Sequence, residues 1–246
     1  MKKSSTIDSI KTIIIAIFIA VLIRSFFAEP FNIPSGSMKP TLLVGDYLFV
    51  KKWEYGYSKH SLPFSLPIIN KRILTKVPER GDVVVFKTPE DNRTDYIKRV
   101  IGLPGDTIKL VNGVVFLNNK SISKIQTDDF IENNKHNKII QSNQYIEYLN
   151  NKNYLTLDTN NLGIADNTNT YTVPDNHLFV MGDNRDNSQD SRFMNPGFIP
   201  IDNLVGKAWF IFFSLENSRF FEIWKWPYSI RYERIFTKIS WIILKK

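Results

Sequence analysis

The chain has 246 residues, of which 43% are hydrophobic and 23% are charged, so it can bury a globular core in one domain or two small ones. Lys and Arg total 32 against 24 Asp and Glu, and the resulting charge of +8 suits an anionic membrane surface as well as nucleic acid. The absence of cysteine excludes disulfides, thiolate catalysis and Cys-ligated zinc, and three scattered histidines, His60, His136 and His177, supply a His-based triad poorly.

An uncharged apolar run, TIIIAIFIAVLI, lies between Lys11 and Arg24 and predicts one transmembrane helix. The run is shorter than the roughly 20 residues that a span needs. The flanking cations can reach the two interfaces, however, which extends the usable segment from Ser9 to Ala28. A buried core helix and a cleaved signal peptide are the alternatives, and the sequence RSFFAEP lacks the small residues of a cleavage site. The lysines before the run favour a cytoplasmic N-terminus.

Short apolar runs follow Pro30, namely DYLFVKKW, GDVVVFK, GVVFLNN and NHLFVMGD. Each is bounded by Gly, Pro, Asn or Asp, which predicts β-strands. No amphipathic stretch of ~12 residues separates them, so we expect antiparallel sheets rather than βαβ units. Residues 55–82 are expected to form a long hairpin or loop, because Pro63, Pro67 and Pro78 interrupt any regular helix.

The domain organisation follows from these patterns and from an Asn- and Lys-rich stretch at residues 117–170. We predict a cytoplasmic start and transmembrane helix at 1–28, a main β domain at 29–110 and 171–230, an inserted smaller β lobe at 111–170, and a basic aromatic tail at 231–246. Trp224, Trp226 and Trp241 in the C-terminal region suit a membrane interface. Packing of an aromatic edge strand, followed by a short terminal helix, explains them equally well.

Three dense patches carry side chains suited to catalysis: PSGSMKPTL around Ser37, DYIKRVIGLPGD from Asp95, and MGDNRDNSQDSR from Met181. A serine attacks an acyl carbon only if a base removes its proton, and a lysine kept neutral by apolar surroundings can be that base. Strand alternation points the Lys98 side chain away from that of Ile97. A contact between Lys98 and a serine therefore cannot be predicted from the local strand geometry alone. Taken singly, the patches also fit a serine-rich turn, a solvated strand lysine and a loop of Asx turns.

Two other motifs fail on inspection. The acidic patch is not an EF-hand loop, because counting from Asp183 places Arg185 third, Ser188 sixth and Met194 twelfth, where the loop needs an oxygen ligand, glycine and glutamate. A Ser-x-x-Lys sequence at Ser121 to Lys124 lacks the two companion motifs of the lactamase class.

The three patches, in this order and behind one apolar helix, resemble the bacterial type I signal peptidases, or leader peptidases, which are membrane-anchored endopeptidases with a Ser/Lys dyad. The blocks EPFNIPSGSMKPTLLVGDYLFVKK, RGDVVVFKTPEDNRTDYIKRVIGLPGDTI and MGDNRDNSQDSR carry the resemblance. NLVGKAWF and WPYSIRYERI extend it toward the C-terminus. The likeness covers roughly the whole chain outside the insert and residues 55–77.

The resemblance implies that Ser37 is the nucleophile and that Lys98, unprotonated, is the general base. It also implies an oxyanion hole formed by the hydroxyl of Ser35 and the backbone N–H of Ser37. Ser188 is expected to hydrogen-bond the Lys98 amine and orient it. Lys39 departs from the family, where an apolar residue is common, and it is a weaker alternative for the base.

Further residues are carried over from the same family. Structural support is expected from Asp183, Arg185, Asp190 and Arg192, the last two as an ion pair. Two shallow apolar pockets for small substrate side chains are expected to be lined by Phe31, Ile33, Met38, Leu42, Tyr96 and Ile97.

The implied fold is mostly β, with two antiparallel β-sheet lobes behind one N-terminal transmembrane helix. No metal or organic cofactor is expected. The implied partners are signal peptides of exported pre-proteins and membrane lipid, with no nucleic acid. The implied location is the bacterial cytoplasmic (inner) membrane, crossed once, with the N-terminus in the cytoplasm and the catalytic domain on the outer, periplasmic side.

Two rival functions remain at this stage. A self-cleaving repressor domain uses related Ser/Lys chemistry, but it needs a DNA-binding domain, and no helix-turn-helix pattern precedes Ser37. A membrane-tethered adaptor that binds peptides by strand addition would have lost catalysis. The presence of both Ser37 and Lys98 argues against that adaptor.

Overall fold

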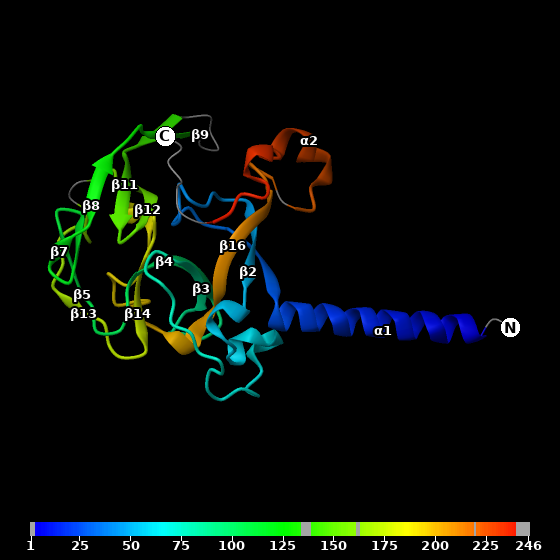
Figure 1. Ribbon diagram of the computed structural model, residues 1–246. Coiled ribbons are helices and arrows are strands. Elements are labelled where there is room, and N and C mark those ends of the chain that lie inside the picture. The colour runs from blue at the N-terminus through cyan, green and yellow to red at the C-terminus, as the bar shows by residue number, and fades with distance from the viewer. Residues whose placement is uncertain (1–2, 134–138, 161–162, 219, 240–246) are drawn as a thin grey trace.

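The computed structural model describes residues 3–133, 139–160, 163–218 and 220–239. A single long helix, α1 (Lys3–Phe26), projects from a body built of β-strands, as Figure 1 shows. Residues Asp8–Phe26 of α1 are long and apolar enough to cross a membrane, and little of that segment is buried against the rest of the chain. The apolar run therefore forms the predicted helix, and it is not a core helix.

The main sheet has seven strands in the order β1-β2-β16-β3-β4-β14-β15, and every neighbouring pair is antiparallel. Its strands are β1 (Ala28–Asn32), β2 (Asp46–Lys51), β3 (Val83–Lys87), β4 (Asp95–Gly102), β14 (His177–Met181), β15 (Ile199–Pro200) and β16 (Leu204–Ser214). The alternating sequence DYLFVK gives β2 one buried face, whereas the uniformly apolar VVVF of β3 is buried on both faces. The predicted antiparallel sheet is therefore present.

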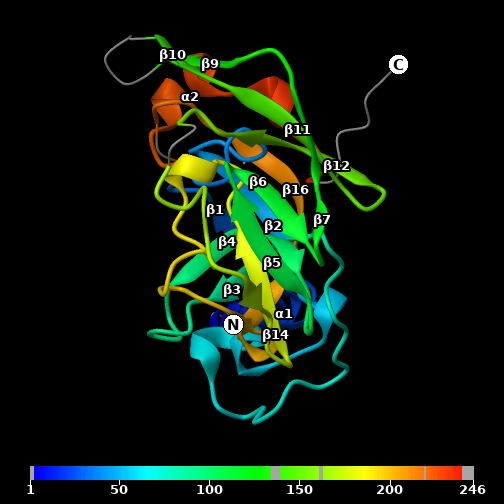
Figure 2. The ribbon, with the colours of Figure 1, turned by 90° about the vertical axis from the view of Figure 1, so that its left-hand side faces the viewer.

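A second lobe is built from three smaller antiparallel sheets, in the orders β13-β5-β6-β7, β12-β11-β8 and β10-β9. Their strands are β5 (Thr107–Val111), β6 (Val114–Leu117), β7 (Lys120–Ser121), β8 (Ser123–Gln126), β9 (Phe130–Asn133), β10 (Ile139–Ser142), β11 (Gln144–Leu149), β12 (Lys152–Leu157) and β13 (Tyr171–Thr172). Figures 1 and 2 both place β9 and β11 at the end of the body opposite the loop that precedes β3. The fold is thus mostly β with two lobes, as predicted.

The lobe boundaries stay a prediction. The strand β5 runs across the expected boundary after residue 110, and β13, which begins just after the expected insert, pairs with β5. One apolar cluster joins Ile108 of β5 to Tyr154 of β12 and Phe179 of β14. The two lobes therefore share part of their core.

The aromatic residues of the C-terminal region are partly packed against the sheet and partly exposed. The ring of Trp226, at the start of α2 (Trp226–Ser229), packs 4.9 Å from that of Phe213 on β16, whereas Trp224 is 69% exposed. Ile239 is buried in the main core, and Trp241 lies outside the described residues. In Figure 1, α2 and α1 extend toward the same side of the body.

The joint between α1 and the main sheet is short and tied down. Only Phe27 separates α1 from β1. Across this joint Arg24 pairs with Glu29 at 2.6 Å, and the hydroxyl of Tyr57 donates to the carbonyl oxygen of Phe26 at 3.0 Å. The helix therefore leads directly into the edge strand that precedes Ser37.

Candidate active site

Ser37 lies in a turn that follows β1 and is held in place from two sides. Its carbonyl oxygen accepts a hydrogen bond from the backbone N–H of Asn184 at 3.0 Å, and the Asn184 side-chain amide donates to the carbonyl of Gly36 at 3.1 Å. Met38, the next residue, is fully buried and anchors the turn in the core. The turn is therefore bound both to the core and to the loop after β14.

Lys98 reaches Ser37 from the middle of β4. Its Nζ donates to the Ser37 Oγ at 2.7 Å, and the two residues are only 4% and 8% exposed. The register of β4 with β3 is regular here, with Lys98 opposite Val84. The long lysine side chain, rather than a bulge in the strand, brings the amine to the hydroxyl. The structure thus places together the two residues that strand alternation left unpaired.

The surroundings of Lys98 favour its neutral form. Burial lowers the pKa of Lys98 to about 8, and the charges of Asp190 and Asp183 oppose this shift only in part. The amine also lies 5.4 Å from the ring centre of Tyr96. A lysine with such a pKa is unprotonated in a substantial fraction of molecules at mildly alkaline pH, so it can accept the serine proton.

Lys39, the alternative base, and the histidines of the described residues contact other groups. Lys39 points to the second lobe, where its Nζ donates to the Glu132 carboxylate at 2.6 Å. His60 contacts Ser65, and His177 contacts the carbonyl of Asp175, while His136 lies outside the described residues. Lys98 is the cation that the structure places on Ser37.

Ser35 lies beside the nucleophile. Its Oγ is 3.4 Å from the Oγ of Ser37, at the outer limit of a hydrogen bond, and the residue is exposed. An exposed hydroxyl next to a buried nucleophile is free to turn toward a bound substrate. This position is compatible with the oxyanion role that the family implies.

Ser188 is close to the nucleophile but does not make the expected bond. Its buried Oγ has no hydrogen-bond partner of ordinary geometry among the described residues, so the predicted bond to Lys98 is absent from this structure. The Lys98 amine is directed at Ser37 instead. A side chain at Gly182 would collide with the Ser188 Oγ and with the carbonyl oxygen of Ser37. Glycine at this position therefore allows these two oxygens to approach the backbone closely.

The loop after β14 is organised by a buried ion pair. Arg192 Nε donates to the Asp190 carboxylate at 2.8 Å, with both side chains almost fully buried, as the sequence predicts. Asp190 also accepts from the backbone N–H of Gly182 at 2.9 Å, and Arg192 donates to the carbonyl of Arg185 at 2.6 Å. Burial raises the pKa of Asp190, but Arg192 and these hydrogen bonds outweigh burial and lower it overall, with a contribution from nearby Ser188.

The remaining predicted support residues use partners that sequence reasoning missed. Asp183 pairs with Arg99 at 2.6 Å, and Arg185 pairs with Glu147 of β11 at 2.5 Å. Tyr154 joins this group by donating its hydroxyl to Glu147 at 2.9 Å. One local signal for Arg99 was its place beside Lys98, between the apolar residues Ile97 and Val100.

The six predicted pocket residues divide between two apolar clusters. Ile33, Met38 and Leu42 are buried in one core cluster, and Phe31 and Ile97 pack against it while remaining partly exposed. Tyr96 packs against a different cluster.

Two free strand edges lie beside this cluster. β1 pairs only with β2 in the described residues, and β14 covers β4 only from Arg99 to Gly102. The edge of β4 from Asp95 to Lys98 is therefore open, and it ends at the candidate base.

A family profile described as signal peptidase, peptidase S26, matches residues 6–213. The chain belongs to this family. A signal peptidase I from Rickettsia massiliae is 39% identical over 244 residues, covering 92% of this chain and 90% of the relative. One from Rickettsia canadensis is 37% identical over 253 residues, covering 96% and 94%.

A solved structure of a signal peptidase I from Enterococcus faecalis is 31% identical, covers 54% of this chain and 97% of its own, and superposes with a TM-score of 0.32. Membership of the signal peptidase family makes this chain a serine endopeptidase that removes signal peptides. The repressor and adaptor alternatives are thereby set aside.

Proposed function

We propose that this signal peptidase is anchored in the bacterial cytoplasmic membrane by α1 and that it cuts exported pre-proteins with Ser37 as nucleophile and Lys98 as general base. The single observation that carries the proposal is the 2.7 Å contact between the Lys98 Nζ and the Ser37 Oγ in a buried setting. A nucleophile and a base at hydrogen-bond distance are the minimal machinery for acyl transfer.

The chemistry proceeds in two steps. Neutral Lys98 takes the proton of the Ser37 hydroxyl as the oxygen bonds to the scissile carbonyl carbon, and the resulting ammonium then protonates the leaving amine. Water, deprotonated by Lys98, next attacks the acyl-serine. The ester bond to Ser37 breaks, the lysine ammonium returns a proton to the Ser37 oxygen, and the signal peptide leaves with a free carboxyl terminus. The Ser35 hydroxyl and the Ser37 backbone N–H are the proposed donors to the oxyanion in both steps.

Substrate binding by strand addition agrees with the free edges of the sheet. An extended peptide between β1 and the Asp95–Lys98 segment of β4 would pair with both strands and bring its carbonyl to Ser37. Alternation sends the side chains one and three residues before the cut to the same face. There the partly exposed Phe31 and Ile97, backed by fully buried neighbours, leave room for small side chains.

The membrane arrangement is argued from α1 and the aromatic surface. The basic residues at the start of the chain favour a cytoplasmic N-terminus, which puts the β body on the outer side. Exposed aromatic residues around α2, on the same side as α1, suit a lipid interface. Membrane lipid is therefore proposed as a second partner beside the signal peptide.

The deciding experiment compares Ser37→Ala with the wild-type protein on a model pre-protein in detergent micelles. We expect turnover to fall by about 10⁴- to 10⁶-fold, because the attacking oxygen is lost while the fold is kept. Ser121→Ala is the matched control. Ser121 lies on β7 in the second lobe, so this variant should cleave the pre-protein at the wild-type rate. Wild-type processing by a folded Ser37→Ala protein would exclude this nucleophile.

A further inference from the structure

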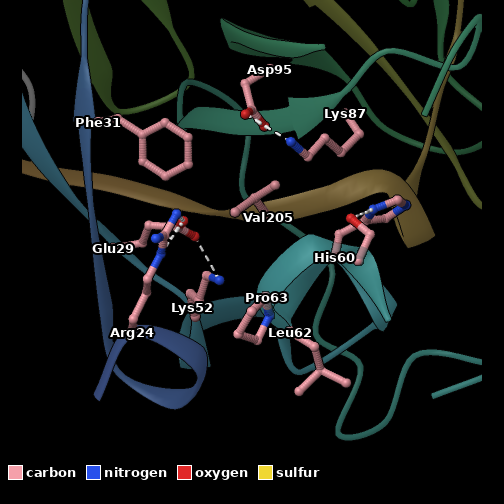
Figure 3. A pocket seen from close by; sticks show the side chains of 11 residues that line it. Arg24, Glu29, Phe31, Lys52, His60, Leu62, Pro63, Lys87, Asp95 and Val205 are labelled. Carbon is pink, nitrogen blue, oxygen red and sulfur yellow. Dashed lines mark hydrogen bonds and ion pairs between the residues drawn. The ribbon is translucent and has the colours of Figure 1, made fainter. Parts of the chain in front are cut away.

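A polar cavity of about 120 Å³ lies beyond the upstream end of the proposed substrate channel. Residues of β1, β16, β3 and β4 line it together with the segment after β2 and the end of α1, so the main sheet wraps around it. Phe31 and Asp95, which belong to the two free strand edges, are among its lining residues (Figure 3). The cavity therefore continues the channel away from Ser37 and toward α1.

Its walls carry two separate ionic groups. On one side Glu29 is shared by Arg24 at 2.6 Å and Lys52 at 2.7 Å, and on the other Lys87 pairs with Asp95 at 2.8 Å (Figure 3). Three cations thus face two carboxylates that are already paired. The cavity has an excess of one positive charge.

Two of the three cations are held by further hydrogen bonds to backbone carbonyls. Lys52 is 2% exposed and also donates to the carbonyl of Ser61 at 2.8 Å, while Lys87 donates to the carbonyl of Arg93 at 2.8 Å. His60, also in the lining, adds no charge near neutral pH, because burial lowers its pKa to about 4. The positive excess therefore comes from Lys52 and Lys87 in the walls together with Arg24 at the solvent side, where its side chain is 63% exposed.

Strand geometry indicates which part of a substrate reaches this cavity. In an extended peptide the side chains one, three and five residues before the cut share one face, and two residues advance the chain by about 6.6 Å. The first two of these meet the apolar surface at Phe31 and Ile97. We expect the next side chain on the same face to lie near Phe31 and Asp95, which line the cavity.

We propose that this cavity is a charge-reading subsite for the side chain five residues before the scissile bond. It accepts a neutral polar or acidic side chain, whose oxygens can take hydrogen bonds from the lysine and arginine donors, and it rejects lysine and arginine. The inference rests on the proposed function and adds a specificity determinant upstream of the two small-residue pockets.

The test uses full-length enzyme in detergent micelles and four peptides that differ only in Ser, Gln, Glu or Lys at the fifth position before the cut, with Ala at the first and third. We expect kcat/KM for the Lys peptide to be about tenfold below that for the Ser peptide, since a like charge enters a site already in positive excess. The Gln and Glu peptides should equal or exceed the Ser peptide. Equal rates for all four would overturn the subsite alone, whereas no cleavage of any peptide would overturn the proposed function as well.

Three variants locate the effect. Lys87→Gln removes the excess charge and leaves Asp95 unpaired, so the penalty against the Lys peptide should disappear, whereas Lys87→Arg should keep it. Lys207→Gln is the matched control, because Lys207 is also an ion-paired lysine of the main sheet, 2.9 Å from Asp82 and outside this cavity. The Ser peptide reports folding and basal activity in every variant. Persistence of the full penalty in Lys87→Gln, or its loss in Lys207→Gln, would refute the assignment.

Discussion

Two consecutive residues of β4 show how differently this protein treats a buried cation. The Lys98 amine contacts a hydroxyl at 2.7 Å and has no carboxylate in direct contact among the described residues, and burial lowers its pKa to about 8. Burial acts on Arg99 as well, but the Asp183 carboxylate, at 2.6 Å, outweighs it and raises the pKa of Arg99 above its ordinary value. One face of the strand therefore carries a group that can lose its proton, and the other carries a permanent ion pair.

The difference teaches that burial alone does not make a residue reactive. Arg99 is enclosed by Asp183, by the carbonyl of Gly81 at 2.8 Å and by the ring of Tyr154 at 4.1 Å, so its charge is fully compensated. Lys98 is desolvated without such compensation. The contrast separates the proposed catalytic role of Lys98 from the structural role of Arg99, although the two residues are adjacent.

The strongest test makes Lys98 resemble its neighbour. Lys98→Arg should lower kcat by about 10⁴-fold, because a guanidinium stays protonated and cannot take the Ser37 proton. In the wild-type protein, kcat/KM should rise with pH through about 8, the pKa of Lys98, since the active form is the deprotonated one. A stopped-assay pH profile on a model pre-protein measures both, and substantial activity in Lys98→Arg would refute the base assignment.

Removing the neighbouring charge should act on stability instead. Arg99→Met leaves the buried Asp183 carboxylate without its partner, which typically costs about 3–5 kcal/mol of unfolding free energy. Urea unfolding of the full chain in micelles measures the loss. The double variant Arg99→Met/Asp183→Asn should recover part of it, because the uncompensated charge is gone. No recovery would mean that packing rather than charge is responsible.

The opposite result is expected when the lysine charge is removed. The gap between the ordinary lysine pKa of 10.5 and about 8 corresponds to a penalty of about 3 kcal/mol for the charged folded state. This penalty is fully present below pH 8, where both states are protonated, and it disappears as pH rises toward 10.5. Lys98→Met should therefore be inactive yet more stable than wild type at pH 6, with the gain vanishing near pH 10.5. Thermal unfolding at both pH values is the measurement.

A smaller change is expected at Ser188. Its Oγ, which has no partner of ordinary hydrogen-bond geometry among the described residues, lies in the small space beside Gly182 that also holds the carbonyl oxygen of Ser37. The family resemblance assigns this hydroxyl to orienting the Lys98 amine. Ser188→Ala should lower kcat by about 10- to 100-fold, leave KM nearly unchanged and move the pH midpoint. A Ser188→Thr variant that restores both values would support a positioning role. A change in stability without any change in pH midpoint would contradict that role.

Local sequence patterns predicted the regular elements but not the contacts between them. The uncharged run gave α1, and alternation gave β2, because each depends on neighbours along the chain. Ser37 and Lys98 are 61 residues apart, and only the family resemblance joined them. Alternation at Ile97 even pointed away from the pair, since it describes strand faces and not the reach of a long side chain.

The supporting ion pairs had no such guide. Arg99 meets Asp183 across 84 residues, and Lys39 meets Glu132 across 93, through loops whose course no local pattern fixes. Whether Ser188 bonds to Lys98 depends on the exact positions of their side chains, and the structure directs the Lys98 amine to Ser37 instead. Such distances depend on how the lobes pack, which the spacing of residues does not encode.

The single residue between α1 and β1 also limits how far Ser37 can lie from the end of α1. Because Phe27 alone links the two elements, and Arg24 and Tyr57 brace the joint, Ser37 cannot move far along the membrane normal independently of the helix. At about 3.3 Å per extended residue, the stretch from Phe26 to Ser37 spans at most roughly 36 Å. In the proposed membrane arrangement, we expect a pre-protein to be cut where its own apolar segment ends at the depth of Ser37, so that the anchor would help to select the scissile bond as well as hold the enzyme.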